Sequence, residues 1–332
     1  MKKPIAILAL FILSALGVKA QVARFQYSTE KMGSPFNLTF ATTSQAKADE
    51  ISKACFLLVD SLVHIFSDYD SSSELNSINH NAGIAPVNVS SRLLDLLLIS
   101  KHAYYESEGA FNIAVGPLSL LWRNARKLKI FPNANEVIIA KQLSVFSLIK
   151  IDSLKQLVYL PLKGMRLDLG GLGKGYIAQL VLNYLSNEGI NQAMVDAGGK
   201  IVMTNSMPPN DSWKIGINLS SSKTKVLDKK LFLTNCAVAT SGDIYQFMYY
   251  KGKKYSHIIN PETGYGLNSQ RNVTVIAKEG AEADWLATAC SILPIKAAIT
   301  LVESKNGGIL IAEQKRGRVK YYKSKEFDKF LK

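Results

Sequence analysis

Hydrophobic and polar residues alternate along the chain with two different periods, and each period predicts a kind of element. Residues 24–28 and 35–43 alternate singly, which is typical of two strands that pair antiparallel. From Ser44 to residue 66 the apolar residues recur every three or four positions, so a helix is predicted with Ser44 as its N-cap. The same spacing predicts further helices at 90–108, 133–142, 176–188, 281–292 and 295–305.

Short apolar runs bounded by turn-forming residues predict strands between these helices. A hairpin is expected at 245–259, with its turn at Lys251-Gly252. The other expected strands are 147–151, 157–160, 191–197, 214–219, 231–242, 271–277 and 307–314. Because strands and helices alternate without a regular βαβ rhythm, we expect an α+β fold with mixed and antiparallel sheets and packed helices. We expect one domain, 21–332, with a division into two closely packed lobes as the alternative.

The first twenty residues have the pattern of a secretory signal peptide. Two lysines precede an apolar stretch from Pro4 to Leu16, and Ala20 is a small residue just before the expected cleavage at Gln21. The apolar stretch is too short for a comfortable bilayer span, although an uncleaved anchor is an open alternative. The sequence therefore predicts an exported protein.

Charge and cysteine content narrow the classes of function. The chain carries 40 basic and 26 acidic residues, a formal net charge of +14, which favours anionic ligands. The basic residues are scattered except in the segment 315–332, interpreted as a solvated tail, and no nucleic-acid-binding module accompanies them. Three cysteines lie far apart in apolar surroundings, so buried thiols are expected at Cys55, Cys236 and Cys290 rather than disulfides or a zinc site.

A glycine-rich segment, "RLDLGGLGKGYIAQL" at 166–180, precedes one of the predicted helices. Its glycines allow main-chain N–H groups to approach a ligand, the helix N-terminus favours an anion, and Lys174 adds a positive charge. The spacing matches neither the P-loop nor the dinucleotide-binding fingerprint. A phosphate cradle and a tight structural turn therefore remain equally open.

Three further segments carry candidate chemistry, each with an ordinary structural alternative. Asp284 and Thr288 lie one turn apart on a predicted helix and suit a hard cation such as Mg²⁺, or are surface residues. His257 precedes a Pro-Glu-Thr-Gly turn and faces a ligand or serves as a structural histidine. Residues 240–243, "TSGD", end a buried strand or line a ligand loop. The segment 67–83 is too polar to be core, and long loops of this kind are often functional.

Taken in order along the chain, these segments resemble one family, the bacterial FAD:protein FMN transferases, once described as thiamine-biosynthesis lipoproteins. The resemblance extends from about Met32 to Ile311. It rests on eight blocks, which are "MGSPFNLTF", "FSDYDSSSELNSIN", "GAFNIAVGPLSLLW", "LDLGGLGKGYIAQ", "VDAGG", "AVATSGD", "HIINPETGYG" and "ADWLATA".

The resemblance implies a Mg²⁺-dependent enzyme that splits the pyrophosphate of FAD, attaches FMN to a Ser or Thr hydroxyl of an acceptor protein and releases AMP. It also implies a periplasmic location, in some cases at the inner membrane, and acceptors that include subunits of membrane redox complexes. No nucleic acid is expected as a partner.

Site residues follow from the resemblance by position. His257 is the expected base for the acceptor hydroxyl, which its ordinary pKa permits. The implied metal ligands are the side chains of Asp284 and Thr288 with the main-chain carbonyls of Gly171 and Ala287. The implied FAD-binding residues are Met32, Tyr69, Ala110, Phe111, Asn112, Asp168 and Lys174.

Four residues depart from the acidic side chains common in that family, namely Asn112, Gln179, Lys200 and Asn260. An amide keeps a polar oxygen but loses the charge, whereas Lys200 reverses its sign. Two alternatives to transfer therefore stay open: an exported protein that binds FAD without reacting it, and an enzyme that hydrolyses FAD to FMN and AMP.

Overall fold

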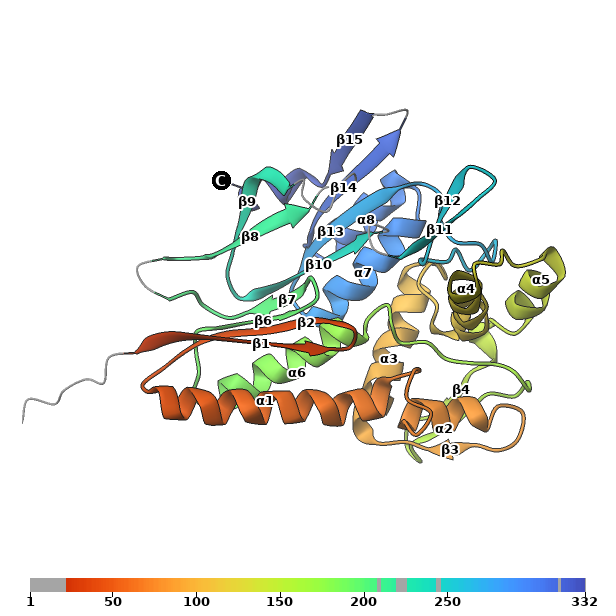
Figure 1. Ribbon diagram of the computed structural model, residues 1–332, viewed down its shortest axis with the longest axis horizontal. Helices are drawn as coiled ribbons and strands as arrows, with labels where there is room; N and C mark the ends of the chain where they lie inside the picture. The colour runs from red at the N-terminus through yellow and green to blue at the C-terminus, as the bar shows by residue number, and fades with distance from the viewer. Residues whose placement is uncertain (1–21, 208–209, 219–225, 243–245, 316–317, 332) are drawn as a thin grey trace, which may run out of the picture.

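An eight-stranded antiparallel sheet forms the centre of the protein (Figure 1). The computed structural model describes residues 22–207, 210–218, 226–242, 246–315 and 318–331. The strands lie in the order β1-β2-β6-β7-β10-β13-β14-β15. Their bounds are Ala23–Lys31, Ser34–Thr42, Ala193–Ala197, Lys200–Met203, Cys236–Gly242, Arg271–Ala277, Gly308–Lys315 and Arg318–Lys323.

Tight turns and strict alternation explain how these strands pair. Met32 and Gly33 have positive φ angles of 53° and 66° and connect β1 to β2 in a two-residue turn, as the paired register of these strands requires. Along β10, Ala237 and Ala239 belong to the main core cluster while Val238 belongs to a second cluster. The sheet therefore buries apolar side chains on both faces.

Helices cover one face of the sheet. In Figure 1, α6 and α7 lie against the strands and α1 lies outside α6. Ser44 caps α1 by accepting a hydrogen bond from the Lys47 N–H, and Gly189 ends α6 with a φ of +78°. The bounds are α1 Gln45–Phe66, α3 Ser91–Glu106, α6 Gly173–Asn187, α7 Gly280–Ile292 and α8 Ile295–Ser304.

The opposite face is covered by the hairpin β8–β9 and a final 3₁₀ segment, Lys325–Phe330. The hairpin consists of β8 Trp213–Asn218 and β9 Val226–Leu233. Phe327 is fully buried in this layer. The interpretation of 315–332 as a solvated tail was therefore wrong. Its described part forms the edge strand β15 and a packed segment, and the many lysines of this stretch obscured the apolar positions that would have predicted them.

A smaller group of elements lies beside the sheet (right side of Figure 1). Trp122 and Val137 pack there on a cluster that includes Ile259. Lys251 and Gly252 form the predicted hairpin turn, both with positive φ. The elements are α2 Glu74–His80, β3 Val87–Asn88, α4 Gly116–Leu128, α5 Ala134–Gln142, β4 Lys150–Asp152, β5 Leu157–Tyr159, β11 Phe247–Tyr250 and β12 Lys253–Ser256.

The architecture confirms the predicted α+β class, and every strand pairing among the described residues is antiparallel. Cys55 and Cys290 are buried as expected, whereas Cys236 is partly exposed. No helix in the described ranges is long and apolar enough to cross a membrane. The expected signal peptide and Asp243 lie outside the described residues.

Candidate functional site

The glycine-rich segment brings α6 and α7 into direct contact. A Cβ atom on Gly175 would lie 2.1 Å from the carbonyl oxygen of Gly280, and one on Gly280 would lie 2.2 Å from the carbonyl oxygen of Gly175. Only glycine at both positions permits this backbone approach. The crossing places the first turn of α6 against Asp284 of α7.

Asp284 is buried at this crossing, with 1% of its surface exposed. Its Oδ2 accepts a hydrogen bond of 3.0 Å from the Gly175 N–H. Its Oδ1 lies 3.1 Å from Lys200 Nζ but accepts no well-aligned hydrogen bond from the described residues. Burial raises the pKa of Asp284, while the Lys200 ammonium and the Gly175 N–H oppose that shift. The carboxylate is thus fixed in place with one oxygen incompletely satisfied.

Other oxygen atoms lie beside this carboxylate. Thr288, one turn further along α7, donates a hydrogen bond of 3.3 Å to the Gly171 carbonyl. A carboxylate, a hydroxyl and a main-chain carbonyl are donors that Mg²⁺ accepts, so these residues fit a hard cation. The Ala287 carbonyl accepts a 2.9 Å hydrogen bond from the Ser291 hydroxyl, so a metal there would have to share this oxygen.

The described ranges contain no group of three or more His, Cys, Asp or Glu side chains placed to hold a metal. Any cation would therefore depend on hydroxyl and main-chain oxygens besides Asp284.

Two lysines surround Asp284. Lys174 Nζ donates a hydrogen bond of 3.1 Å to Ser34 Oγ, next to the turn that holds Met32. Burial and the charge of Lys200 lower the pKa of Lys174, and Asp284 opposes them. Two ammonium groups around one carboxylate give this cluster an excess positive charge that suits a phosphate or pyrophosphate.

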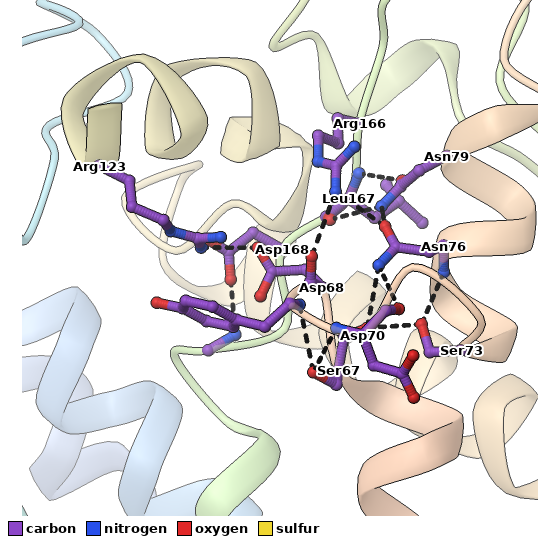
Figure 2. Close-up of polar contacts among 12 residues, drawn as sticks. Ser67, Asp68, Asp70, Ser73, Asn76, Asn79, Arg123, Arg166, Leu167 and Asp168 are labelled. Carbon is purple, nitrogen blue, oxygen red and sulfur yellow. Dashed lines mark hydrogen bonds and ion pairs between the residues drawn. The ribbon is translucent and has the colours of Figure 1, made fainter. Parts of the chain in front are cut away.

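A second part of the candidate site lies around Asp68, Arg123 and Asp168 (Figure 2). Tyr69 is 74% exposed, and the Arg123 guanidinium lies 3.8 Å from its ring centroid. Arg123 also pairs with Asp68 at 2.6 Å. Burial and the neighbouring Asp168 raise the pKa of Asp68, while Arg123 opposes this rise. The network holds an aromatic ring at the surface next to a carboxylate.

Sequence reasoning missed most of the residues that support this second part. Asn79, on α2, exchanges two hydrogen bonds with the main chain of Leu167, of 3.2 and 2.7 Å. Asn76 is 1% exposed and accepts a 2.8 Å hydrogen bond from Arg166. The segment 67–83 is therefore partly helical and partly core, contrary to prediction, because partners distant in sequence satisfy its amides.

The remaining predicted FAD residues lie near these two parts. Phe111 is 3% exposed, packs 6.2 Å from Trp285 of α7 and borders Gly171, where an added Cβ would lie 3.0 Å from its ring. Ala110 is half-buried against the same core. Asp168 accepts a 2.8 Å hydrogen bond from the Gly170 N–H. The segment 168–174 thus connects the Tyr69 and Asp284 parts.

His257 lies in the loop after β12. Its main-chain N–H donates to the Gln246 carbonyl at 3.0 Å, and its ring Nδ1 lies 3.2 Å from the same oxygen. A carbonyl only accepts, so this contact favours a proton on Nδ1 and places the basic lone pair of the neutral ring on Nε2. In that tautomer Nε2 is the ring nitrogen that can accept a proton.

Comparison with known proteins identifies the family of the chain. Residues 32–311 match the ApbE family. This chain belongs to the ApbE family.

Several relatives of the chain are named FAD:protein FMN transferase. One, from Klebsiella pneumoniae (strain 342), is 30% identical over 78% of this chain and 79% of its own length. Another, from Vibrio cholerae serotype O1, is 26% identical over 98% of both chains.

Solved structures support the same assignment. The flavin transferase ApbE from Vibrio cholerae is 25% identical and superposes with a TM-score of 0.83 over 94% of this chain and all of its own. The ApbE protein from Thermotoga maritima gives a TM-score of 0.82 at 25% identity, over 93% of this chain and 99% of its own. The predicted family and fold are confirmed.

Within this ApbE chain, two of the four unusual residues form hydrogen bonds that need no charge. Asn112 Oδ1 accepts from the Ala114 N–H at 2.8 Å, and its amide nitrogen donates to the Ser144 carbonyl at 3.2 Å. Asn260 Oδ1 accepts from the Glu262 N–H at 2.8 Å and stabilises the turn before Gly264. An amide can do both jobs at Asn112, whereas a carboxylate could only accept.

Gln179 has a comparable role between helices. Its Oε1 accepts a hydrogen bond of 3.0 Å from the N–H of Gly280, the first residue of α7. This contact satisfies one of the donors that a helix N-terminus leaves open. Gln179 therefore supports the α6–α7 crossing as a neutral residue.

We expect Gln179→Ala to lower the free energy of unfolding by about 1 kcal/mol, because the Gly280 N–H loses its acceptor. Gln179→Glu keeps an oxygen and adds a negative charge at a helix N-terminus, so it should equal or exceed wild type. Urea unfolding followed by circular dichroism measures both variants. Equal stability of the alanine variant and wild type would contradict this role.

Proposed function

We propose that this chain transfers FMN from FAD to a Ser or Thr hydroxyl of an acceptor protein, with Mg²⁺ present, and releases AMP. The observation that carries the proposal is the cluster at the start of α6, where buried Asp284 lies with Lys174, Lys200 and other oxygen donors. The names of the relatives support the flavin transfer. In the reaction, the acceptor oxygen bonds to the FMN phosphorus as that phosphorus loses its bond to the bridging oxygen.

The residues present suggest how FAD would be held. The pyrophosphate would lie at the N-terminus of α6, where main-chain N–H groups and Lys174 favour its negative charge. The exposed Tyr69 ring offers a surface on which a flat ring can stack, with Arg123 on its other side. Asp168 lies between the two and can accept hydrogen bonds from FAD.

Asp284, Thr288 and the Gly171 carbonyl would hold Mg²⁺. Bound there, the ion would neutralise charge on the pyrophosphate and orient it for in-line attack. The protein's own part is to oppose the rise that burial causes in the pKa of Asp284, through the Lys200 ammonium and the hydrogen bond from the Gly175 N–H to Oδ2.

The acceptor hydroxyl must lose a proton as it attacks phosphorus. His257 Nε2 would receive that proton, since Nδ1 faces the Gln246 carbonyl. We also propose that the chain acts outside the cytoplasm, in the periplasm or at the inner membrane, because its first residues resemble a secretory signal. An acceptor in a membrane redox complex would meet it there.

The test incubates the mature protein with FAD, Mg²⁺ and an acceptor domain from the same organism. Intact-mass spectrometry should show an FMN-sized gain on the acceptor, together with one AMP per FMN transferred. AMP without an acceptor would instead indicate FAD hydrolysis. If FAD is bound intact and no AMP forms with or without the acceptor, the chain is a flavin-binding protein without transfer activity.

We expect His257→Ala to reduce the rate of FMN transfer about 100- to 10,000-fold, the usual contribution of a general base. FAD affinity, measured by fluorescence titration, should change little because the histidine acts on the acceptor. His102→Ala, at an exposed histidine on α3, is the control. Transfer at wild-type rates by the His257 variant would remove His257 from the mechanism.

A further inference from the structure

Lys200 occupies a position in β7 whose side chain, by the alternation of side chains along the strand, points toward the core. Val202, two residues later, packs with the helix-side cluster, and Met203 packs on the opposite side. Because side chains two residues apart in a strand share a face, Lys200 projects toward α7. Its side chain is only 13% exposed. A lysine there must have a partner for its charge.

Two oxygen atoms supply that partnership. Lys200 Nζ donates a hydrogen bond of 2.7 Å to the Thr240 carbonyl on the adjacent strand β10. The same nitrogen lies 3.1 Å from Asp284 Oδ1. The start of the strand is fixed as well, since the Gly199 N–H donates to Asp196 Oδ1 at 2.7 Å. The ammonium is therefore held beside the carboxylate by the sheet itself.

This ammonium has a direct consequence for any metal at Asp284. It neutralises a buried carboxylate that would otherwise need another cation. A divalent ion that approaches Oδ1 meets a positive charge already placed on that oxygen. Like charges at such a distance, in a water-poor site, repel strongly.

We propose that Lys200 is a tethered cation that competes with divalent metal for Asp284, so that metal binds tightly only when a pyrophosphate draws the ammonium away. This inference rests on the proposed function, because the pyrophosphate is that of FAD. Lys200 has a second ammonium close by, Lys174, and the two charges already disfavour each other. A pyrophosphate between them accepts hydrogen bonds from both ammonium groups, so that Asp284 Oδ1 becomes free to bind the metal.

Metal and FAD binding then reinforce each other. FAD binding removes the ammonium that repels the metal, and the metal in turn adds positive charge beside the phosphates. By linkage, each ligand raises the affinity for the other by the same factor, typically about 5- to 150-fold. Without Lys200 the metal would bind well alone, and most of this coupling would disappear.

The experiment titrates Mn²⁺, a spectroscopic substitute for Mg²⁺, into the mature protein and follows free Mn²⁺ by electron paramagnetic resonance. No acceptor is present, so activity does not enter. We expect Lys200→Met to bind Mn²⁺ about 10- to 100-fold more tightly than wild type when FAD is absent. Added FAD should increase Mn²⁺ affinity strongly in wild type and little in the variant, after correction for Mn²⁺ bound to FAD alone.

Stability provides an independent measurement. The metal-free K200M protein should melt at a lower temperature than wild type, since Asp284 loses its neutralising charge. Added Mn²⁺ should return the melting temperature to that of wild type. If the metal-free variant does not fold, the Mn²⁺ concentration that restores its circular dichroism reports the same affinity. Lys200→Arg keeps the charge and should keep the weak wild-type affinity.

The control is Lys278→Met, which removes an exposed positive charge between β13 and α7 and should leave Mn²⁺ affinity unchanged. A K200M protein that binds Mn²⁺ with wild-type affinity would overturn the proposal. So would an equal effect of FAD on both proteins. If no variant binds Mn²⁺ at all, with or without FAD, the metal site of the proposed function is wrong too.

Discussion

Replacing Asp284 by asparagine is expected to lower the rate of FMN transfer about a thousandfold, because metal charge stabilisation of several kcal/mol would be lost and each ~1.4 kcal/mol is tenfold. Asparagine has the same shape, and its oxygen can still accept from the Gly175 N–H. The fold should therefore survive. The missing charge leaves the nearly buried Lys200 without its carboxylate, which we expect to reduce the free energy of unfolding by about 3 kcal/mol.

Transfer rates are measured by flavin fluorescence of the acceptor after denaturing electrophoresis, and stability by urea unfolding. Glu282→Gln, a half-buried acid on the same helix, is the matched control and should retain transfer within about twofold of wild type. A folded D284N protein that transfers FMN at the wild-type rate would exclude Asp284 from catalysis. A variant that is inactive only because it is unfolded is recognised by its circular dichroism.

Local signals explain what the sequence predicted well. Ser44, Ser90 and Asn133 cap α1, α3 and α5 through side chains that need only the next few residues. The turn at Lys251-Gly252 is also set locally, by two positive φ angles. The residues that determine where such an element begins or ends lie within one turn of the chain. Residue type and spacing were therefore sufficient to predict it.

Elements with distant partners were predicted poorly. In α2 only Leu75 and Ile78 give an apolar signal, and the buried Asn76 and Asn79 depend on Arg166 and Leu167 far along the chain. The edge strand β15 exposes many of its side chains and exists because β14 pairs with it.

The candidate site shows the same division. The spacing of Asp284 and Thr288 on one helix left a hard-cation site and surface residues both open, and only the resemblance named them as metal ligands. Gln179 and Lys200 were recognisable as unusual residues, but their contacts were not predictable. Gln179 meets Gly280, and Lys200 meets Asp284, only when α6 and β7 pack on α7. Sequence therefore identified these residues without their interactions.

Replacing Gly175 by alanine is expected to destabilise the protein by about 2 kcal/mol. The new Cβ would lie 2.1 Å from the Gly280 carbonyl oxygen and 2.8 Å from Asp284 Cβ. Overpacking of this kind costs about 1–3 kcal/mol, and a clash with backbone belongs at the upper end. The better helix propensity of alanine returns about 1 kcal/mol. The helices must separate, and their displacement moves Asp284 away from Gly171, so FMN transfer should fall as well.

Gly173→Ala separates the clash from the general effect of alanine in α6. A Cβ atom on Gly173 would have no neighbour within 4 Å, so this substitution should leave stability unchanged or raise it by about 0.4–1 kcal/mol. Urea unfolding of the two variants side by side measures the difference. Because the two glycines lie in the same helical turn, equal stabilities would show that α6 and α7 do not depend on backbone contact at Gly175, and the position of Asp284 would need another explanation.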